Sequence, residues 1–326
     1  MRRQRIQSRL VDRQRLRRTE RPAHHQAEST ALMSNQVLDE MAMPPLFHAA
    51  EDASDANQRR FFRLKIVELS GLVVGVAGGL VPAAWAAGLG PAVSVLAFLV
   101  VLTLQISKVS PKAESRWYDA RAAAESIKSA SWQYAVGGEV FRLEDADAEA
   151  RFVARLQDVL RTVPALELGP VTRASAGVTP DMSALRSSSQ EKRSSDYRRL
   201  RIDDQIAWYA SKSRLNRKRS HIFAALTVGT EAAAIVAGLW RLKFETDTDF
   251  LALFAVVAAG LIAWSQAKKY TSLAQSYSVT SHEVNLVADT VRAPVTETKW
   301  AQSIHDAEAA FSREHTMWQA RRQGPA

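Results

Sequence analysis

Cysteine is absent from this chain of 326 residues. The protein therefore has no disulfide bond, no thiol nucleophile and no cysteine ligand for a metal ion. Such a composition is compatible with a reducing compartment, and it leaves the function to be argued from other residues.

The motifs of common catalytic and nucleotide-binding sites are also absent. The sequence contains no G-x-x-x-x-G-K-[ST], no G-x-G-x-x-G and no G-x-S-x-G. The His–Glu neighbours at 282–283 and 314–315 lack the second ligand one helical turn away that a zinc site on a helix needs. Asp203 and Asp204 are adjacent, so on a helix they point in different directions and make a poor acid–base pair. We expect no enzymatic activity, no catalytic residue, no metal site and no cofactor.

Positive charge is concentrated at the start of the chain and beside apolar segments. The net charge is +9, and nine arginines fall within the first 21 residues. No apolar segment follows them directly, which argues against a secretory signal. We expect residues 1–42 to form a disordered, Arg-rich tail; a start at Met33 or Met41 is the alternative. The distribution does not favour a nucleic acid as partner.

Four long apolar segments occur as two pairs. They cover residues 66–86, 91–107, 222–240 and 250–267. About 20 apolar residues are enough to cross a bilayer as a helix. The segments are apolar all round rather than along one stripe, which argues against a surface hairpin of a soluble protein. The sequence predicts an all-α membrane protein with two tandem transmembrane helical hairpins (four crossings) and cytoplasmic amphipathic helices.

Basic residues mark the orientation of both hairpins. Those at the predicted cytoplasmic ends are Arg59, Arg60, Arg63, Lys65, Lys108, Lys112, Arg214, Arg217, Lys218, Arg219, Lys268 and Lys269. The tip of the first hairpin has no charge, and the second tip has two basic and three acidic residues. By the positive-inside rule, both termini and the central region lie in the cytoplasm and the protein is a multi-pass membrane protein.

The two hairpins divide the chain into two domains of similar plan. We expect a first two-transmembrane domain at 43–163 and a second at 196–323. Residues 164–195 are rich in proline, glycine and serine and are predicted to be a linker. The similar order of segments in both halves indicates an internal duplication.

Small residues recur every four positions in the first and third crossings. The two ridges contain Gly71, Gly75 and Gly79, and Gly229, Ala233 and Ala237. In lipid, small residues at this spacing let two helix backbones approach closely. Each ridge either packs on the partner of its own hairpin or meets another subunit of a homo-oligomer.

Two glutamates fall within the crossings. Glu231 is near the middle of the third crossing, where a charged side chain costs roughly 2.5–3.5 kcal/mol on insertion scales. It is a candidate pore-lining or gating carboxylate, or else a protonated or hydrogen-bonded structural residue near Thr227 or Thr230. Glu68 lies near the start of the first crossing, where its side chain can reach the cytoplasmic interface.

Aromatic and charged residues alternate along the cytoplasmic helices at three- and four-residue spacing, which places them on single helix faces. The possible ligand or partner face contains Trp117, Arg121, Arg201, Trp208 and Lys212. One interpretation is that these stripes are packing faces between helices. The other is that the basic and aromatic side chains hold an anionic nucleotide through charge and stacking.

Four segments carry a resemblance to a known family. They are "PPLFHAAEDASDANQRRFF" (44–62), "RWYDARAAAESIKSASWQYA" (116–135), "YRRLRIDDQIAWYASKSRLNRKR" (197–219) and "AEAAFSREHTMWQARR" (307–322). Together with the hairpins, both halves resemble the bacterial SLATT superfamily of two-transmembrane effector domains associated with nucleotide second-messenger systems. The resemblance implies a membrane effector that forms pores when a partner triggers it, and it carries over no catalytic residue. Because the chain has no recognisable nucleotide-synthesising or sensing domain, the trigger is a separate protein of that kind or a directly bound ligand.

Two functions therefore follow from the sequence. The first is a pore-forming effector that oligomerises in the inner membrane. The alternative is a membrane-anchored scaffold that recruits a cytoplasmic partner without conducting. A small transporter is a weaker third hypothesis, because no pair of Gly/Pro-broken helices marks a substrate site at the membrane midplane.

Overall fold

The computed structural model describes residues 41–81, 88–163, 168–169, 177–245, 248–291 and 296–322, and for residues 290 and 312–322 it describes the backbone alone. The predicted Arg-rich tail, except for its last two residues, lies outside this range. The described residues from Met43 onward belong to one compact unit. Within it, every regular element that the structure describes is a helix, in agreement with the all-α prediction.

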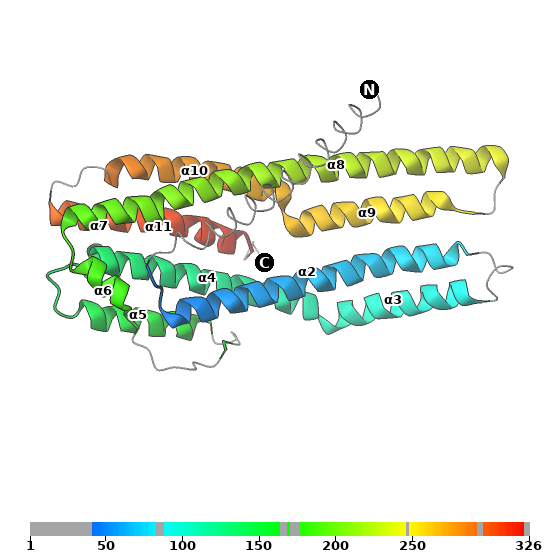
Figure 1. The fold of residues 1–326 in the computed structure, drawn as a ribbon. Coiled ribbons are helices and arrows are strands. Elements are labelled where there is room, and N and C mark those ends of the chain that lie inside the picture. Colours follow the sequence, from blue (N-terminus) through cyan, green and yellow to red (C-terminus); the bar gives the residue numbers. More distant parts are fainter. Residues whose placement is uncertain are drawn as a thin grey trace, which may run out of the picture. The chain divides into compact units, whose positions relative to one another are not determined.

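The first half is built from three long helices. α2 (Pro45–Gly79) starts at a proline, whose fixed φ angle suits the first helical turn, and continues without a break into the apolar segment. α3 (Leu89–Ser107) runs back beside it, and α4 (Val109–Val136) continues beside the first part of α2 (Figure 1). α4 ends at Gly137, which has a φ of 75° and so adopts the left-handed conformation common after helices.

The second half repeats this plan. α8 (Asp204–Phe244) carries the third apolar segment, and α9 (Phe250–Lys268) runs back beside it. α10 (Tyr270–Val291) packs against the first part of α8, as α4 does against α2 (Figure 1). α11 (Glu297–Arg322) follows and contacts both α10 and α4.

The same backbone break occurs at equivalent places in the two halves. α3 and α9 each contain 19 residues. Each is followed by a lysine in the left-handed conformation, Lys108 with a φ of 50° and Lys269 with a φ of 53°. This conformation costs a non-glycine residue roughly 1–2 kcal/mol, so two such residues at matching positions are unusual. The break supports the duplication that the sequence indicates.

Three helices of the described residues are long and apolar enough to cross a membrane. They lie at Leu89–Ser107, within the continuous helix Gln190–Phe244, and within Phe250–Asp289. The predicted first crossing is not among them, and its last residues, 82–86, lie outside the described part of the chain. The structure thus supports a membrane protein, with three of the four predicted crossings meeting these criteria.

The glycine ridge of α2 faces the partner helix of its own hairpin. A Cβ atom added to Gly71 would lie 2.6 Å from Val101 Cγ2, and one added to Gly75 would lie 2.7 Å from Phe98 Cζ. At Gly79 the nearest atom would be Ser94 Oγ at 3.9 Å, which is ordinary contact. Gly71 and Gly75 therefore allow α2 and α3 to pack closely, as the first of the two interpretations expects.

The ridge of α8 does not face its hairpin partner in the same way. No heavy atom lies within 4 Å of the position that a Cβ of Gly229 would take. Ala233 and Ala237 are half-buried. The close approach to α9 is made instead by Gly238, where a Cβ would lie 2.6 Å from Leu251 Cδ1. The Gly229 end of this ridge is open in the single chain.

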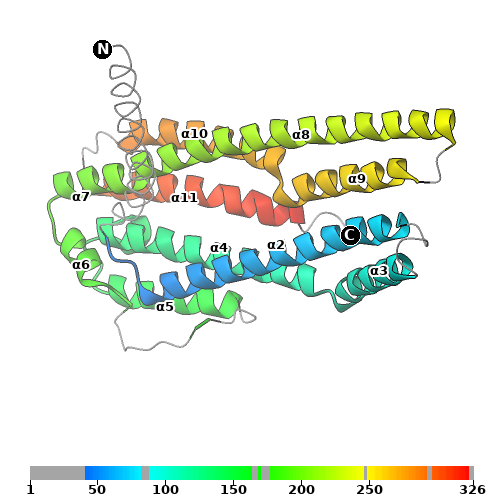
Figure 2. The same ribbon diagram turned by 45° about the vertical axis from the view of Figure 1, so that its right-hand side comes forward.

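The two halves pack against each other along two helix pairs. α2 lies next to α9, and α4 lies next to α11, in both views of the ribbon (Figures 1 and 2). The first pair involves the apolar helices, and the second lies among the helices that the sequence predicts to be cytoplasmic.

The stretch predicted as a linker contains folded helices, which corrects that prediction for its described part. α6 (Pro180–Arg186) and α7 (Gln190–Tyr197) both contact α4, as does α5 (Ala148–Thr162) before them. Met182 is fully buried and Leu185 is 8% exposed. Composition suggested a linker because serine dominates, but two apolar side chains at helical spacing are enough to hold a short helix on α4.

Two arginines of this stretch bind the end of α4. Arg186 Nη1 donates to the carbonyl oxygens of Tyr134 at 2.7 Å and Phe141 at 2.8 Å, and its guanidinium lies 4.7 Å from the centre of the Tyr134 ring. Arg193 Nη1 donates to Val136 O at 3.0 Å. The last carbonyl groups of a helix have no partner within it, so these cations satisfy them and oppose the negative end of the helix dipole.

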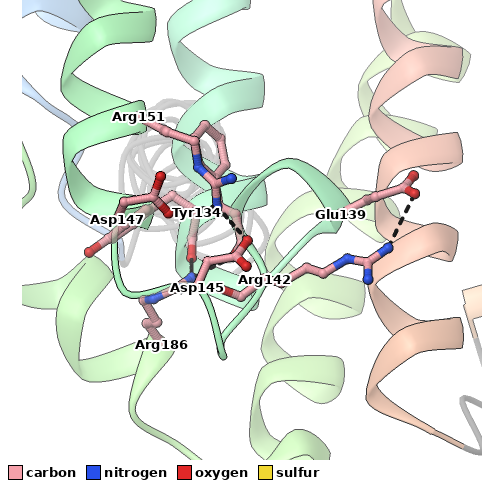
Figure 3. Close-up of polar contacts among 8 residues, drawn as sticks. Tyr134, Glu139, Arg142, Asp145, Asp147, Arg151 and Arg186 are labelled. Atoms are coloured by element: carbon pink, nitrogen blue, oxygen red, sulfur yellow. Dashed lines mark hydrogen bonds and ion pairs between the residues drawn. The ribbon is translucent and has the colours of Figure 1, made fainter.

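The turn after α4 is a short 3₁₀-helix, η1 (Glu139–Phe141), and it is tied together by ion pairs (Figure 3). Arg142 Nη2 lies 3.4 Å from Glu139 Oε1. Arg151 of α5 pairs with Asp145, and its Nη2 atom lies 3.4 Å from Asp147 Oδ1. These contacts hold together the segment between α4 and α5 and the first turn of α5.

The packing of α2 on α3 can be tested by enlarging one glycine. Leucine at Gly75 inserts a side chain where the Phe98 ring already lies, and such overpacking typically costs about 1–3 kcal/mol. Gly79→Leu is the matched control and should change stability by about 0.5 kcal/mol or less, because a Cβ atom there makes only ordinary contact. Thermal unfolding of both variants in detergent measures the difference. Equal melting temperatures for Gly75→Leu and the unmodified protein would contradict the close contact.

Candidate functional site: a basic and aromatic pocket between the two halves

A cavity of about 350 Å³ lies where the two halves meet. Its walls come from α2 and α4 of the first half and from α8, the end of α9 and α10 of the second. Its aromatic lining residues are Phe62, Trp117, Tyr118, Trp208, Tyr270 and Tyr277, and its basic ones are Arg121, Lys212, Arg219, Lys268 and Lys269.

Helical spacing explains why these side chains converge. Trp117 and Arg121 are one turn apart on α4. Trp208, Lys212 and Arg219 follow one face of α8. Both faces turn toward the junction between the halves, so two stripes that are distant in the chain line one cavity.

The aromatic walls are fixed by contacts among themselves. The rings of Trp117 and Tyr118 are stacked with centroids 4.4 Å apart, and Phe62 meets Trp117 edge-on at 5.6 Å. On the other side, Trp208 meets Tyr277 edge-on at 5.3 Å. Such pairs contribute about 0.5–1.5 kcal/mol each beyond their burial. The walls are therefore held in place without a ligand.

The basic side chains rest on these rings. Lys268 Nζ lies 3.2 Å from the centre of the Phe62 ring, and Lys212 Nζ lies 5.6 Å from that of Trp208. Lys269 Nζ lies 5.4 Å from the Tyr118 ring and 4.0 Å from Glu114 Oε1. Cation–π contacts place an ammonium group without neutralising it. The pocket therefore keeps a strongly positive lining.

Four of the five residues of the predicted ligand face line this pocket, and one does not. The four are Trp117, Arg121, Trp208 and Lys212. Arg201 lies in a π-helical segment, η2 (Arg198–Asp203), between α7 and α8. It is 1% exposed and is directed into the interior of the helical bundle. Assigning Arg201 to the ligand face was wrong, because a stripe on one helix does not show which neighbour each part of it meets.

The partner of Arg201 is a buried carboxylate 107 residues away. Arg201 Nη2 donates to Glu308 Oε2 at 2.8 Å, and Nε donates to Oε1 at 3.0 Å. Tyr197 Oη donates to the same Oε1 at 2.9 Å, and the guanidinium lies 4.6 Å from the centre of the Phe311 ring. Glu308 is fully buried. This cluster joins η2 to α11.

The charges of this cluster depend on each other. Burial acts to lower the pKa of Arg201, but the carboxylate of Glu308 outweighs it and raises that pKa above its usual value. Burial, reinforced by the charge of Glu308, raises the pKa of the Tyr197 hydroxyl well above its usual value. The tyrosine therefore remains protonated and donates its hydrogen bond, and the arginine remains charged.

The two glutamates of the crossings have different surroundings. Glu68 Oε2 accepts a hydrogen bond from Lys65 Nζ at 2.9 Å, so its charge is paired beside the predicted interface. Glu231 is exposed, and none of the described residues forms a hydrogen bond or ion pair with it. Thr227 and Thr230 donate instead to carbonyl groups of their own helix, Phe223 O and Leu226 O. The hydrogen-bonded alternative for Glu231 is therefore not present in the single chain.

Sequence reasoning did not name Phe62, Lys268 or Tyr277 as site residues, although they line the pocket. The sequence marks Lys268 only as a charge that flanks an apolar segment. Its position right after an apolar segment was the available signal, because such a residue lies where the crossing meets the helical bundle. Among the described residues, no group of three or more histidine and acidic residues could hold a metal ion.

Comparison with known families agrees with this duplicated layout. The model of SMODS and SLOG-associating 2TM effector domain 3 (SLATT_3) matches residues 44–194, and that of SMODS and SLOG-associating 2TM effector domain 1 (SLATT_1) matches residues 197–318. The chain belongs to the SLATT superfamily. It holds two tandem SLATT domains, as its sequence predicted. No curated protein and no solved structure matches the chain.

The boundary between the SLATT domains falls at residues 194–197, at the end of α7, and the helix continues through it into α8. The pocket is lined by both domains. Residues 58–122 of the lining come from the first SLATT domain, and residues 208–277 come from the second. The cavity is therefore a product of the tandem arrangement.

The buried ion pair makes a testable contribution to stability. Glu308→Gln leaves Arg201 buried without a counter-ion and should lower the free energy of unfolding by about 3–5 kcal/mol. Asp158→Asn removes the exposed pair with Arg161 and should cost about 1 kcal/mol or less. Denaturant unfolding in detergent measures both.

The double variant Arg201→Met/Glu308→Leu serves as a further control. Removing both charges should restore most of the stability lost in Glu308→Gln, because no unpaired charge remains buried. A double variant as unstable as the single one would show that the pair is not the source of the loss.

Proposed function

We propose that the tandem SLATT chain is an inner-membrane effector that oligomerises and forms a pore when a threat-sensing system triggers it. The observation that carries this proposal is Glu231, an exposed carboxylate on an apolar helix with no partner among the described residues. In lipid such a group costs roughly 2.5–3.5 kcal/mol on insertion scales. Assembly of several chains around a water-filled path would remove that cost.

The apolar helices have little cover within one chain. Each of these helices contains an apolar stretch of 18 residues. The buried share of that stretch is 17% in α3, none in α8 and 6% in α9. These surfaces are available to lipid and to other copies of the chain. The open ridge at Gly229 is on one of them, and small residues at this spacing support close helix packing in lipid.

The basic residues beside the hairpins support an orientation with both termini and the helical bundle in the cytoplasm. The bundle is then the part that a trigger reaches. We expect the trigger to come from a separate nucleotide-synthesising or ligand-sensing protein, and the chain itself to have no enzymatic role and no cofactor. Genes beside this one that encode such a protein would support this assignment.

Dye release from liposomes tests conduction. The purified chain, reconstituted and triggered by co-reconstitution with the product of a neighbouring sensor gene, should release dye, and Glu231→Ala should abolish most of the release. Val228→Ala is the matched control, because this exposed apolar residue lies on the same helix and should keep full release. Liposomes that stay tight with the unmodified chain would contradict the pore. A cellular phenotype that Glu231→Ala leaves intact and Trp208→Ala abolishes would favour the non-conducting scaffold.

Crosslinking tests the oligomer. Gly229→Leu fills the open ridge and should reduce crosslinked oligomers about tenfold, because overpacking at a helix contact costs about 1–3 kcal/mol. Ala224→Leu, an exposed position on another side of the same helix, should leave the oligomers unchanged. Oligomers of normal yield in Gly229→Leu would show that this ridge faces lipid.

A further inference from the structure

Three basic side chains of the pocket have no acidic partner in the described part of the chain. Among the described residues, no carboxylate lies within ion-pair distance of Lys212, Arg219 or Lys268. Asp119 is the one acidic residue among those that line the cavity. Lys268 and Lys212 rest on aromatic rings instead, which hold their ammonium groups in place but leave the charge unbalanced. An arrangement of this kind lowers its energy by taking up an anion.

The volume and the lining of the pocket suit a small molecule. A volume of about 350 Å³ is within the range of ligand sites in proteins, roughly 300–1,000 Å³. The stacked pair of Trp117 and Tyr118 and the ring of Trp208 offer flat apolar surfaces beside the cations. Lysine and arginine together are the side chains that bind phosphate oxygens.

The position of the pocket links it to the membrane helices. Arg219 lies three residues before the third crossing, and Lys268 directly follows the fourth. Trp208 lies eleven residues before Arg219 on α8, about 16 Å farther from the crossing. The cavity therefore extends from the predicted membrane interface into the helical bundle.

We infer that this pocket binds a phosphate-bearing ligand between the two SLATT domains. The phosphate lies among Lys212, Arg219 and Lys268, and the rest of the ligand lies against the aromatic walls. A soluble nucleotide and the headgroup of an anionic phospholipid both supply this chemistry. Since the ligand contacts both domains, its binding favours one spacing of the two hairpins. The inference goes beyond the proposed pore, because binding to the pocket does not require conduction.

A binding experiment in detergent tests the soluble source. The full-length chain is purified in a maltoside detergent, which has no phosphate, and titrated with ATP and with inorganic pyrophosphate by calorimetry. We expect saturable binding that Lys212→Gln or Lys268→Gln weakens about tenfold or more, the effect of losing one charge-assisted hydrogen bond. Lys218→Gln is the matched control, because Lys218 is an exposed neighbour outside the cavity and should bind as before. A normal melting temperature shows that each variant is folded.

Native mass spectrometry tests the lipid source. The chain is released from nanodiscs of phosphatidylcholine with one fifth phosphatidylglycerol, and the phosphatidylglycerol that remains bound is counted. Retention that Lys212→Gln and Lys268→Gln abolish, but Lys218→Gln does not, would support the pocket with a lipid as its ligand. Binding of neither probe, or equal weakening by Lys218→Gln, would overturn the inference. Neither arm uses dye release, so tight liposomes would contradict the pore and leave this inference standing.

Discussion

The carbonyl oxygen of Val136, at the end of α4, is the point on which the arrangement of the two SLATT domains depends. A buried helix end has unpaired carbonyl groups that must find donors within the protein. Here Arg193 of α7 and Trp300 Nε1 of α11 both donate to Val136 O, the latter at 2.8 Å. Arg193 in turn pairs with Glu297 at the start of α11. One helix terminus thereby holds elements from both domains.

The bundle and the apolar hairpins are stabilised by different forces. The bundle relies on buried polar groups that satisfy each other, such as Arg201 with Glu308, because water is excluded while the charges remain. α2 and α3 instead make close contact at Gly71 and Gly75, the kind of packing that stabilises helices in lipid. α2 and α8 each run without a break from the bundle into an apolar segment.

The pocket is a consequence of where the helices change partners. α9 packs against α2 and α8, whereas α10 packs against α8 and α11. The chain changes direction between them at Lys269, which adopts the left-handed conformation. Side chains just before and after this break cannot all be covered by one neighbour. Lys268 and Tyr270 therefore face a cavity that the α4 and α8 stripes complete.

The sequence by itself determined the helical class, the positions of the apolar segments and the membership of both halves in the SLATT superfamily, because length, all-round apolarity and charge at the flanks are local properties. It also indicated part of the pocket lining, since Trp117 and Trp208 share helix faces with basic residues. Only the tertiary structure decided that Arg201 forms an ion pair with Glu308, that helices of the supposed linker pack on α4, and that Gly229 faces away from its hairpin partner. Periodicity shows which face of a helix is special, but the neighbour it meets depends on contacts between residues that are far apart in the chain.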